Sequence, residues 1–552
     1  MINQNPQNEY SKEIEAFVKS NGSKASAARL LGIPRRTLSD RLEKAGVNQL
    51  SDVVGGKITA VEADKIPLPP KGKFNAFICT VAQSSTQLHS SFFTLEQIMN
   101  DIADQKNCNQ ASLLVSQITY NKGSYGKKSV KPGTKKESDD DSLWFAPETI
   151  KYATNERVQL APDLIFCGED NALPTAKNPL TALEAYAGHP SLIIPHNRLQ
   201  MKPAPRPYGM PPKNMFSTGT VTQRNFIQKR AGIEAEFHHA YGGLIVLIDS
   251  DGFWFPFELT ADNYGKIYFL NKQYGPDGIV KENVRPEALI PGDIHADEID
   301  PGVWQATWSG ERSVIDTLQP RKQVWHDLLS MRRRSKHDIK DKYLMYIKYV
   351  ANEDKVEDEI EVTAKFTREA SRPFCQSFVC HSNHDEHLEQ WMKITGAQDH
   401  DYPNVRYYHE LEAEKYRQLE NSNFGFNLME WALLQKGMPK KVQFLSDEPV
   451  VICKKYGGGI LISEHGHSGI NGGRASPVSM RKVSVKTSVG HSHSPHRIDG
   501  FMQGGTSSLL NLGYNKGGFT TWDHVHQLIY PNAKRCFLFI RNSKWIPDEF
   551  EL

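Results

Sequence analysis

The chain has 552 residues, of which 39% are hydrophobic, and a formal charge of +2 at pH 7. This length predicts about three domains with real hydrophobic cores, and the nearly balanced charge gives no global field that would attract nucleic acid. No run of about 18 apolar residues occurs, so we expect no transmembrane helix, and the polar first residues predict no signal peptide.

The cysteines indicate a reducing compartment. Seven cysteines are scattered through the chain, and none of them forms a Cys-x-x-C motif. An odd, dispersed set is typical of free thiols in the cytosol. We therefore expect a cytoplasmic protein without a membrane partner.

The first residues, 1–50, predict a compact helical module. Apolar side chains at helical spacing predict helices over Ser11–Ser20, Ser23–Leu31 and Arg35–Ala45. Gly32 stands in the turn before the last helix, where a residue without Cβ strain is needed. The run Ala27–Leu38 resembles a helix-turn-helix of the Fis type.

The third helix of this module is a candidate DNA-binding element. Residues 1–50 carry 8 basic and 5 acidic side chains. With Leu38 and Leu42 inward, the exposed face could meet phosphates and base edges in a major groove. The alternative is a helical hairpin for protein contacts whose basic residues are merely solvated. The candidate DNA-binding residues are Arg35, Arg36, Thr37, Ser39, Arg41 and Lys44.

Three further regions precede the richest part of the chain. Residues 51–73 predict a linker, because they combine Gly55-Gly56 with a stiff proline-rich run. Residues 74–235 predict an α/β domain of unknown role, since strand-like Phe77–Val81 and Ala111–Ser116 flank a helix-like segment in one βαβ unit. Residues 236–284 predict a β-rich connector with a hairpin turn at Asp249–Gly252.

Residues 285–552 contain five short polar motifs, each after a short apolar, strand-like run. Fifteen of the 20 histidines lie at or after His295, so the enrichment is regional. Imidazole, carboxylate and carboxamide groups suit Mn²⁺, Fe²⁺, Zn²⁺ or Mg²⁺. In chain order, the motifs are Asp293-x-His295, Asp327, Asn383-His384, His465 and Gly490-His491-x-His493.

These motifs, in this order, resemble the ligand blocks of the calcineurin-like metallophosphoesterases. The resemblance implies that residues 285–552 form a catalytic domain with a four-layer αββα sandwich. It also implies two divalent metal ions, Mn²⁺ or alternatively Mg²⁺, Fe²⁺ or Zn²⁺, about 3.5–4 Å apart, which clamp the attacking and leaving oxygens of a displacement at phosphorus.

The resemblance implies a role for each motif residue. Asp327 would bridge the two metals. His384 would be the catalytic residue that stabilises the phosphorane charge or protonates the leaving oxygen. The remaining implied ligands are Asp293, His295 and His493 for the first metal, and Asn383, His465 and His491 for the second.

The sequence departs from the family pattern at two turns. His326 and Ser382 stand where family members usually have glycine. The first departure leaves Asp338 as a rival to Asp327 for the bridging position. A single His-x-His is by itself more often a surface or core pair than a metal site. The possible outer-shell residues are His326, His337, Asp385 and His467.

The layout of about residues 76–545 resembles the early DNA-transfer and host-DNA-degrading proteins of tailed bacteriophages. The resemblance rests on stretches such as Thr119–Lys122, Ser382–Asp385 and Glu464–Gly469. It implies a DNase that acts on DNA in the cytoplasm of a bacterial host cell, and we expect a homo-oligomer. The alternatives are a DNA-binding regulator with a degenerate phosphoesterase domain, and a small-molecule phosphodiesterase or phosphatase.

Overall fold

The computed structural model describes residues 31–44, 63–120, 144–186, 188–335, 338–394, 401–446, 448–473, 475–512 and 517–552, together with Lys12, Ala16 and Ala28. The chain divides into two compact units, Met1–Asp64 and Lys65–Leu552. Within the described ranges, no helix is both long enough and apolar enough to cross a membrane.

The first unit contains helix α4 (Arg35–Lys44), which ends one residue before the predicted boundary. Leu38 and Leu42 are fully buried, as their spacing predicts. Gly32 has a φ of 64°, the left-handed conformation expected in the turn before this helix. Most of the two preceding predicted helices, and residues 51–62 of the predicted linker, lie outside the described residues.

The second unit is built on sheets of eleven, six and four strands. The eleven-stranded sheet has the order β1 (Asp64–Lys65), β4 (Arg157–Ala161), β5 (Leu164–Cys167), β6 (Ser191–Ile194), β9 (Lys213–Ser217), β7 (Gln200–Ala204), β22 (His496–Ile498), β23 (Phe501–Gln503), β21 (Lys486–Val489), β20 (Ile460–Leu461) and β19 (Val451–Ile452).

The other sheets are shorter. The six-stranded sheet has the order β18 (Gln443–Phe444), β17 (Gln376–Val379), β16 (Lys322–Trp325), β15 (Ala288–Ile290), β25 (Val525–Ile529) and β26 (Arg535–Phe539). The four-stranded sheet has the order β11 (Trp254–Thr260), β10 (Gly242–Ile248), β2 (Phe74–Gln83) and β3 (Cys108–Ile118). The two small sheets are β12 (Ile267–Phe269), β13 (Lys272–Gly275) and β14 (Gly278–Lys281), and β24 (Phe519–Thr520) with β8 (Arg206–Pro207).

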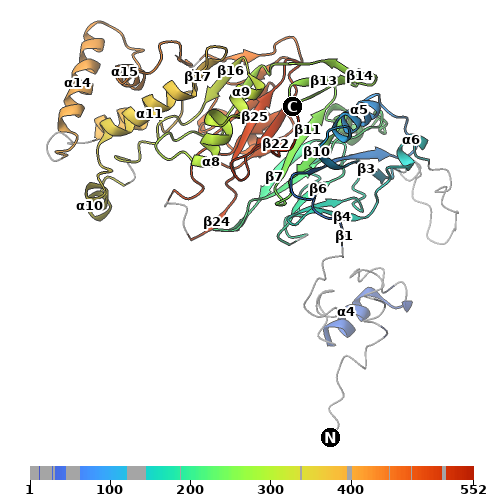
Figure 1. Cartoon of the computed structure of the whole chain (residues 1–552). Coiled ribbons are helices and arrows are strands. Elements are labelled where there is room, and N and C mark those ends of the chain that lie inside the picture. Colours follow the sequence, from blue (N-terminus) through green and yellow to red (C-terminus); the bar gives the residue numbers. More distant parts are fainter. Residues whose placement is uncertain are drawn as a thin grey trace. The chain divides into compact units, whose positions relative to one another are not determined.

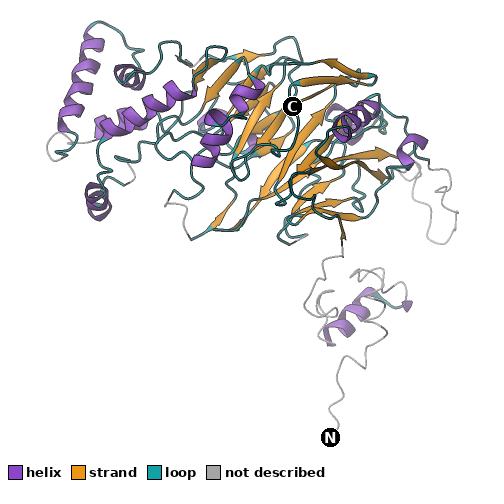
Figure 2. Cartoon of the chain, in the orientation of Figure 1, coloured by secondary structure: helices purple, strands orange, loops and turns teal. Residues whose placement is uncertain are grey.

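Helices surround these sheets, as Figures 1 and 2 show. In the second unit they are α5 (Ser91–Ala103), α6 (Pro147–Ile150), α7 (Arg230–Phe237), α8 (Pro301–Trp304), the π-helix η4 (Gln305–Ser309), α9 (Val314–Leu318), α10 (Lys342–Val350), α11 (Val356–Ala370), α12 (His387–Ile394), α14 (Val405–Glu420), α15 (Leu428–Gln435), the 3₁₀ helix η5 (Ile470–Gly472) and α16 (Pro477–Met480).

The core lies between two β layers and between the sheets and the helices. Because side chains alternate along a strand, Ile290 of β15 packs with Ile460 of the eleven-stranded sheet, while its neighbour Leu289 shares a core with Ile360 of α11. The four-stranded sheet is packed in the same way as the six-stranded sheet. One of its faces contacts the eleven-stranded sheet, and the other contacts α5. The fold is therefore a mixed α/β architecture, as the sequence predicts.

The predicted strands are present, but the predicted boundaries at residues 235 and 284 do not separate compact units. β7 of the predicted α/β domain pairs directly with β22 of the predicted catalytic domain. Residues 65–73, which the sequence places in a linker, also belong to the second unit, where the N–H of Ile66 donates to the carbonyl of Gln159 at 3.1 Å. The hydrophobic periodicity of a short segment does not indicate which distant strand it pairs with, so the sequence could not predict this pairing.

Candidate metal centre

The loops that carry the five motifs leave neighbouring strands in the same direction. β15, β16 and β17 are parallel, so their carboxyl ends lie at one edge of the six-stranded sheet. β20 and β21 are parallel in the facing sheet. A hydrogen bond of 2.9 Å from Gly490 to His465 joins their loops, and His491 donates its N–H to Asp293 at 2.7 Å. Ligands on short loops after rigid strands are held with little freedom.

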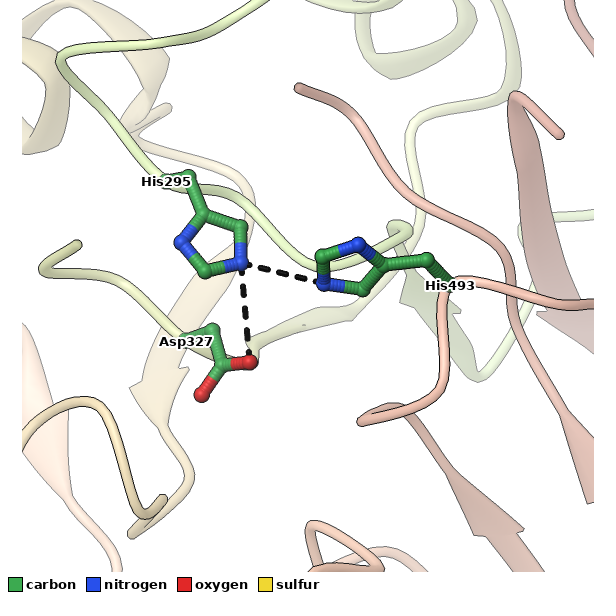
Figure 3. A group of neighbouring side chains, drawn as sticks. All are labelled: His295, Asp327 and His493. Atoms are coloured by element: carbon green, nitrogen blue, oxygen red, sulfur yellow. Dashed lines mark hydrogen bonds and ion pairs between the residues drawn. The ribbon is translucent and has the colours of Figure 1, made fainter. Parts of the chain in front are cut away.

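The first group of converging side chains is His295, Asp327 and His493, shown in Figure 3. The Nε2 atom of His295 lies 3.1 Å from Nε2 of His493 and 3.6 Å from Oδ2 of Asp327. All three side chains are buried. Two imidazole nitrogens and a carboxylate that face one another could hold a metal ion.

The second group is Asp293, Asp327 and His465, also buried. Nε2 of His465 lies 3.2 Å from Oδ1 of Asp327. Asp327 thus offers one carboxylate oxygen to each group, which is the geometry of a bridging ligand. The rival Asp338 forms an ion pair of 3.3 Å with Lys348 and belongs to neither group.

Several buried ligand atoms lack a hydrogen-bond partner. They are Oδ1 of Asp293, Nδ1 of His295, both carboxylate oxygens of Asp327, Oδ1 of Asn383, Nε2 of His465 and Nδ1 of His493. Burying polar atoms without partners is costly. A bound cation would satisfy the oxygen atoms and Nε2 of His465, so the donor set fits a divalent metal.

The electrostatics of the site favour metal binding. Burial lowers the pKa of His493 to about 3 and that of His295 well below its usual value, so both imidazoles are neutral and keep a lone pair. Burial, reinforced by the charge of Asp327, raises the pKa of Asp293 well above its usual value. Burial also opposes ionisation of Asp327, but interactions with His465 and His384 outweigh it and hold the pKa of Asp327 well below its usual range.

The backbone of the ligand loops is strained. His295, Asp327, His491 and His493 have φ angles of 46°, 45°, 83° and 57°, in the left-handed region that these residues rarely adopt. Gly490 packs so closely that a Cβ there would lie 2.0 Å from Oδ1 of Asp293. Such strain concentrates at functional sites, where the surrounding structure enforces it.

The remaining implied ligands, His491 and Asn383, and the implied catalytic residue His384 are carried by the same set of loops. The ring of His491 lies 5.1 Å from that of His465. Asn383 follows β17, which pairs with β16, the strand that ends two residues before Asp327. The ring of His384 lies 4.7 Å from that of His295, and its Nδ1 lies 3.0 Å from the carbonyl oxygen of Ser330. This contact leaves Nε2 of His384 as the nitrogen that could meet a substrate.

The predicted outer-shell residues take different places. Nδ1 of the buried His326 lies 3.3 Å from Nδ1 of His465, where it can orient that ring. Asp385 accepts the N–H of Leu329 at 3.1 Å and so supports the loop after Asp327. The ring of His467 lies 5.6 Å from that of His465. His337 lies outside the described residues.

Two residues outside the five sequence motifs also contact the site. The ring of Trp522 packs on that of His493 at 4.2 Å. The hydroxyl of Thr506 donates to the carbonyl of Asp293 at 3.1 Å. Neither residue belongs to a ligand motif, so only the packing of distant segments places them here.

The candidate DNA-binding residues are distributed over α4. Arg36 and Lys44 are exposed, while Thr37, Ser39 and Arg41 are half-buried. Arg35 begins the helix, and its side chain lies outside the description.

Comparison with known proteins gives two similarities. Residues 14–44 match a family model described as bacterial regulatory protein, Fis family. The chain is 32% identical to Protein A1 of Escherichia phage T5 over 480 residues, which cover 85% of this chain and 82% of that protein. No solved structure matches the chain.

Proposed function

We infer that this chain, which belongs to the family of Protein A1 from Escherichia phage T5, is a metal-dependent phosphodiesterase that acts on DNA. The observation that carries the proposal is the place of Asp327 between two groups of buried ligands. A shared carboxylate between two three-residue groups suits a two-metal hydrolytic site. The face-to-face sheets with outer helices support the metallophosphoesterase sandwich implied by the sequence.

The chain's own residues would hold two ions. His295, His493 and the shared Asp327 would bind one, and His465, His491 and Asn383 would complete the other. Asp293 groups with Asp327 and His465, but its Oδ2 also lies 3.4 Å from Nε2 of His493, so its carboxylate could serve the first ion, as the sequence implies. When bound, divalent ions such as Mn²⁺ supply an activated water and neutralise charge on the phosphate. His384 lies on the His295 side of this cluster and can direct a proton toward the leaving oxygen.

Two observations favour DNA over a small substrate. The N-terminal unit matches the Fis-family helix-turn-helix, a fold that places a helix in the major groove. The similarity to a phage protein covers most of the chain. The buried, unpaired candidate ligands disfavour the alternative of a regulator with a degenerate phosphoesterase domain. Unpaired buried polar atoms destabilise the fold, so a chain that no longer bound metal would gain stability by replacing them.

The proposal is tested with purified full-length chain, Mn²⁺ and three substrates: linear DNA, a cyclic nucleotide and a phosphomonoester. We expect cleavage of DNA that stops on addition of EDTA and returns with excess Mn²⁺. Faster turnover of the cyclic nucleotide or the phosphomonoester would assign a small substrate. Absence of hydrolysis with Mn²⁺, Mg²⁺, Fe²⁺ and Zn²⁺ would overturn the enzymatic function.

Deletion of residues 1–50 should weaken DNA binding without abolishing cleavage at saturating DNA. The reason is that α4 carries basic side chains but none of the metal-ligand groups. Each lost phosphate contact should reduce the slope of log affinity against log salt by about 0.9. The measurement is a fluorescence-anisotropy titration of a labelled duplex at several salt concentrations.

The matched control is the double variant Arg36→Gln/Lys44→Gln, which removes two exposed charges and leaves the buried leucines in place. We expect it to flatten the salt dependence in the same direction as the deletion. Equal affinity of intact and deleted chains at every salt concentration would assign the helix-turn-helix to a protein partner.

A further inference from the structure

We infer that the second unit contains one β architecture twice, at residues 74–261 and again at residues 287–540, and that only the second copy holds a metal centre. The inference goes beyond the proposed function, because it assigns a role to the half of the fold that lacks the ligand motifs.

Ten strands of the eleven-stranded sheet are symmetric in their order, and β1 adds to one end. Outward from its centre, the sheet reads β7-β9-β6-β5-β4 on one side and β22-β23-β21-β20-β19 on the other. In both halves the successive pairings are antiparallel, parallel, parallel and antiparallel. The central pair β7-β22 is antiparallel, so a two-fold axis between them would exchange the halves.

The other β layer repeats the same relation. β3-β2-β10-β11 corresponds to β16-β15-β25-β26, and in each set the pairings are parallel, antiparallel and antiparallel. The corresponding strands also occur in the same order along the chain. Coincidence in order, direction and layer over nine strand pairs is the signature of an internal structural repeat.

Hydrogen bonds fix the register between the copies. The hydroxyl of Thr220 donates to the carbonyl of Val81 at 2.8 Å, and that of Thr506 donates to the carbonyl of Asp293 at 3.1 Å. Each threonine also forms an isolated parallel bridge to the same partner. Val81 therefore occupies the position of the metal ligand Asp293.

A second pair of hydrogen bonds supports this register. The N–H of His89 donates to the carbonyl of Val221 at 2.7 Å, and that of Asp300 donates to the carbonyl of Ser507 at 2.9 Å. Val221 and Ser507 each follow the anchoring threonine. His89 and Asp300 each stand just ahead of a helix on the outer face, α5 in one copy and α8 in the other.

Counting along the paired strands from these anchors gives the residues that replace the other ligands. They are Gln83 for His295, Glu169 for His465 and His196 for His491. Gln117 stands for Asp327, because the N–H of Ser84 donates to the carbonyl of Ile118 as that of Ala296 donates to the carbonyl of Leu328. Where the six-stranded sheet continues from β16 to β17, Val115 of β3 forms an isolated parallel bridge to Ala153, and Thr154-Asn155-Glu156 follows in place of the Asn-His motif. Both central carboxylates of the metal centre are thus absent from the first copy.

The replacement side chains have hydrogen-bond or ion-pair partners outside the replaced ligand set. Nε2 of Gln83 donates to the carbonyl of Asn225 at 3.0 Å. Oε1 of Gln117 accepts from Asn155 at 3.1 Å. Glu169 pairs with Arg157 at 2.8 Å. Among the described residues of the first copy, no group of His, Cys, Asp and Glu could hold a metal.

The first copy therefore acts as a built-in partner for the second. β7 covers the edge of β22, the strand that follows the loop of His491 and His493. Glu258 of β11 forms a buried ion pair with Arg497 of β22. Without the first copy, β22 would be an exposed edge next to the metal loop. Corresponding strands of the two copies run in opposite directions, so their carboxyl ends lie at opposite ends of the sheet. The positions in the first copy that correspond to metal ligands are therefore far from the metal centre and take no part in hydrolysis.

The test uses a matched pair of variants, Thr220→Val and Thr506→Val, in the full-length chain. Each removes the same hydroxyl from the same place in its copy, so each should lower the melting midpoint by a similar amount, roughly 1–2 °C for a unit of this size. Only Thr506→Val should weaken Mn²⁺ binding, because only its partner strand carries a metal ligand. Metal is counted by elemental analysis after equilibrium dialysis against Mn²⁺.

The intact chain should bind at most two Mn²⁺, and Asp327→Asn should lose them. Binding of four Mn²⁺, or Mn²⁺ retained by the first copy in Asp327→Asn, would overturn the inference. So would a Thr220→Val variant that lowers Mn²⁺ affinity as much as Thr506→Val does. If the intact chain binds no Mn²⁺ but the two variants lose equal stability, the proposed function fails while the structural repeat stands.

Discussion

Replacing Asp327 with asparagine is expected to abolish phosphodiester hydrolysis, with a loss of turnover of at least roughly 10³-fold, the upper range for removing one charge-stabilising group. The carboxylate presents one oxygen to His295 at 3.6 Å and the other to His465 at 3.2 Å. An amide keeps the shape but offers one neutral oxygen in place of two that share a negative charge. Metal content and turnover of linear DNA should therefore fall together.

The matched control for this variant is Asp338→Asn. Asp338 makes the same kind of charged contact, an ion pair with Lys348, but stands outside both ligand groups. The Asp338→Asn variant should keep its bound metal and its rate of DNA hydrolysis. Full activity in Asp327→Asn together with inactivity in Asp338→Asn would move the bridging position to Asp338.

Replacing His384 with alanine should lower kcat by about 10²–10³-fold while leaving metal content unchanged. His384 packs against the ligand His295, and its Nδ1 lies 3.0 Å from the carbonyl oxygen of Ser330, which fixes the ring. It belongs to neither metal-ligand group. Single-turnover kinetics with Mn²⁺ at saturating DNA would separate this loss from a change in binding.

The matched control is His381→Ala, three residues earlier on the same loop. Its imidazole is exposed and pairs with Glu386 at 3.2 Å. That variant should keep near-normal turnover. If His384→Ala turned over DNA like His381→Ala, with the same metal content, His384 would have no part in the chemistry.

The local sequence pattern was sufficient to predict the strand that precedes each candidate ligand motif. Each ligand block follows a short apolar run, and the structure has a strand before each of Asp293, Asp327, Asn383, His465 and His491. The helix-turn-helix could also be predicted from the sequence, because its signals, Gly32 in the turn and the spacing of Leu38 and Leu42, lie within a few residues of one another. Strands and helices begin and end on local chemistry, so one sequence can indicate them.

The assignment of Asp327 over Asp338 needed the tertiary structure. Both are aspartates that directly follow a histidine, and the turn residue His326 departs from the family pattern. Only the folded chain shows that Asp327 faces both ligand groups while Asp338 turns toward Lys348. The same holds for Trp522 and Thr506, which reach the site from distant segments.

The sequence by itself determined the types of the candidate ligands, their order and the strands that present them, because these follow from hydrophobic spacing and side-chain chemistry within a few residues. The tertiary structure alone decided that residues 65–552 form one unit, that Val81 stands where Asp293 stands, and that β7 closes the edge beside the metal loop. Such relations are set by hydrogen bonding and packing between segments far apart in the chain, and a backbone arrangement can be kept after its side chains have diverged.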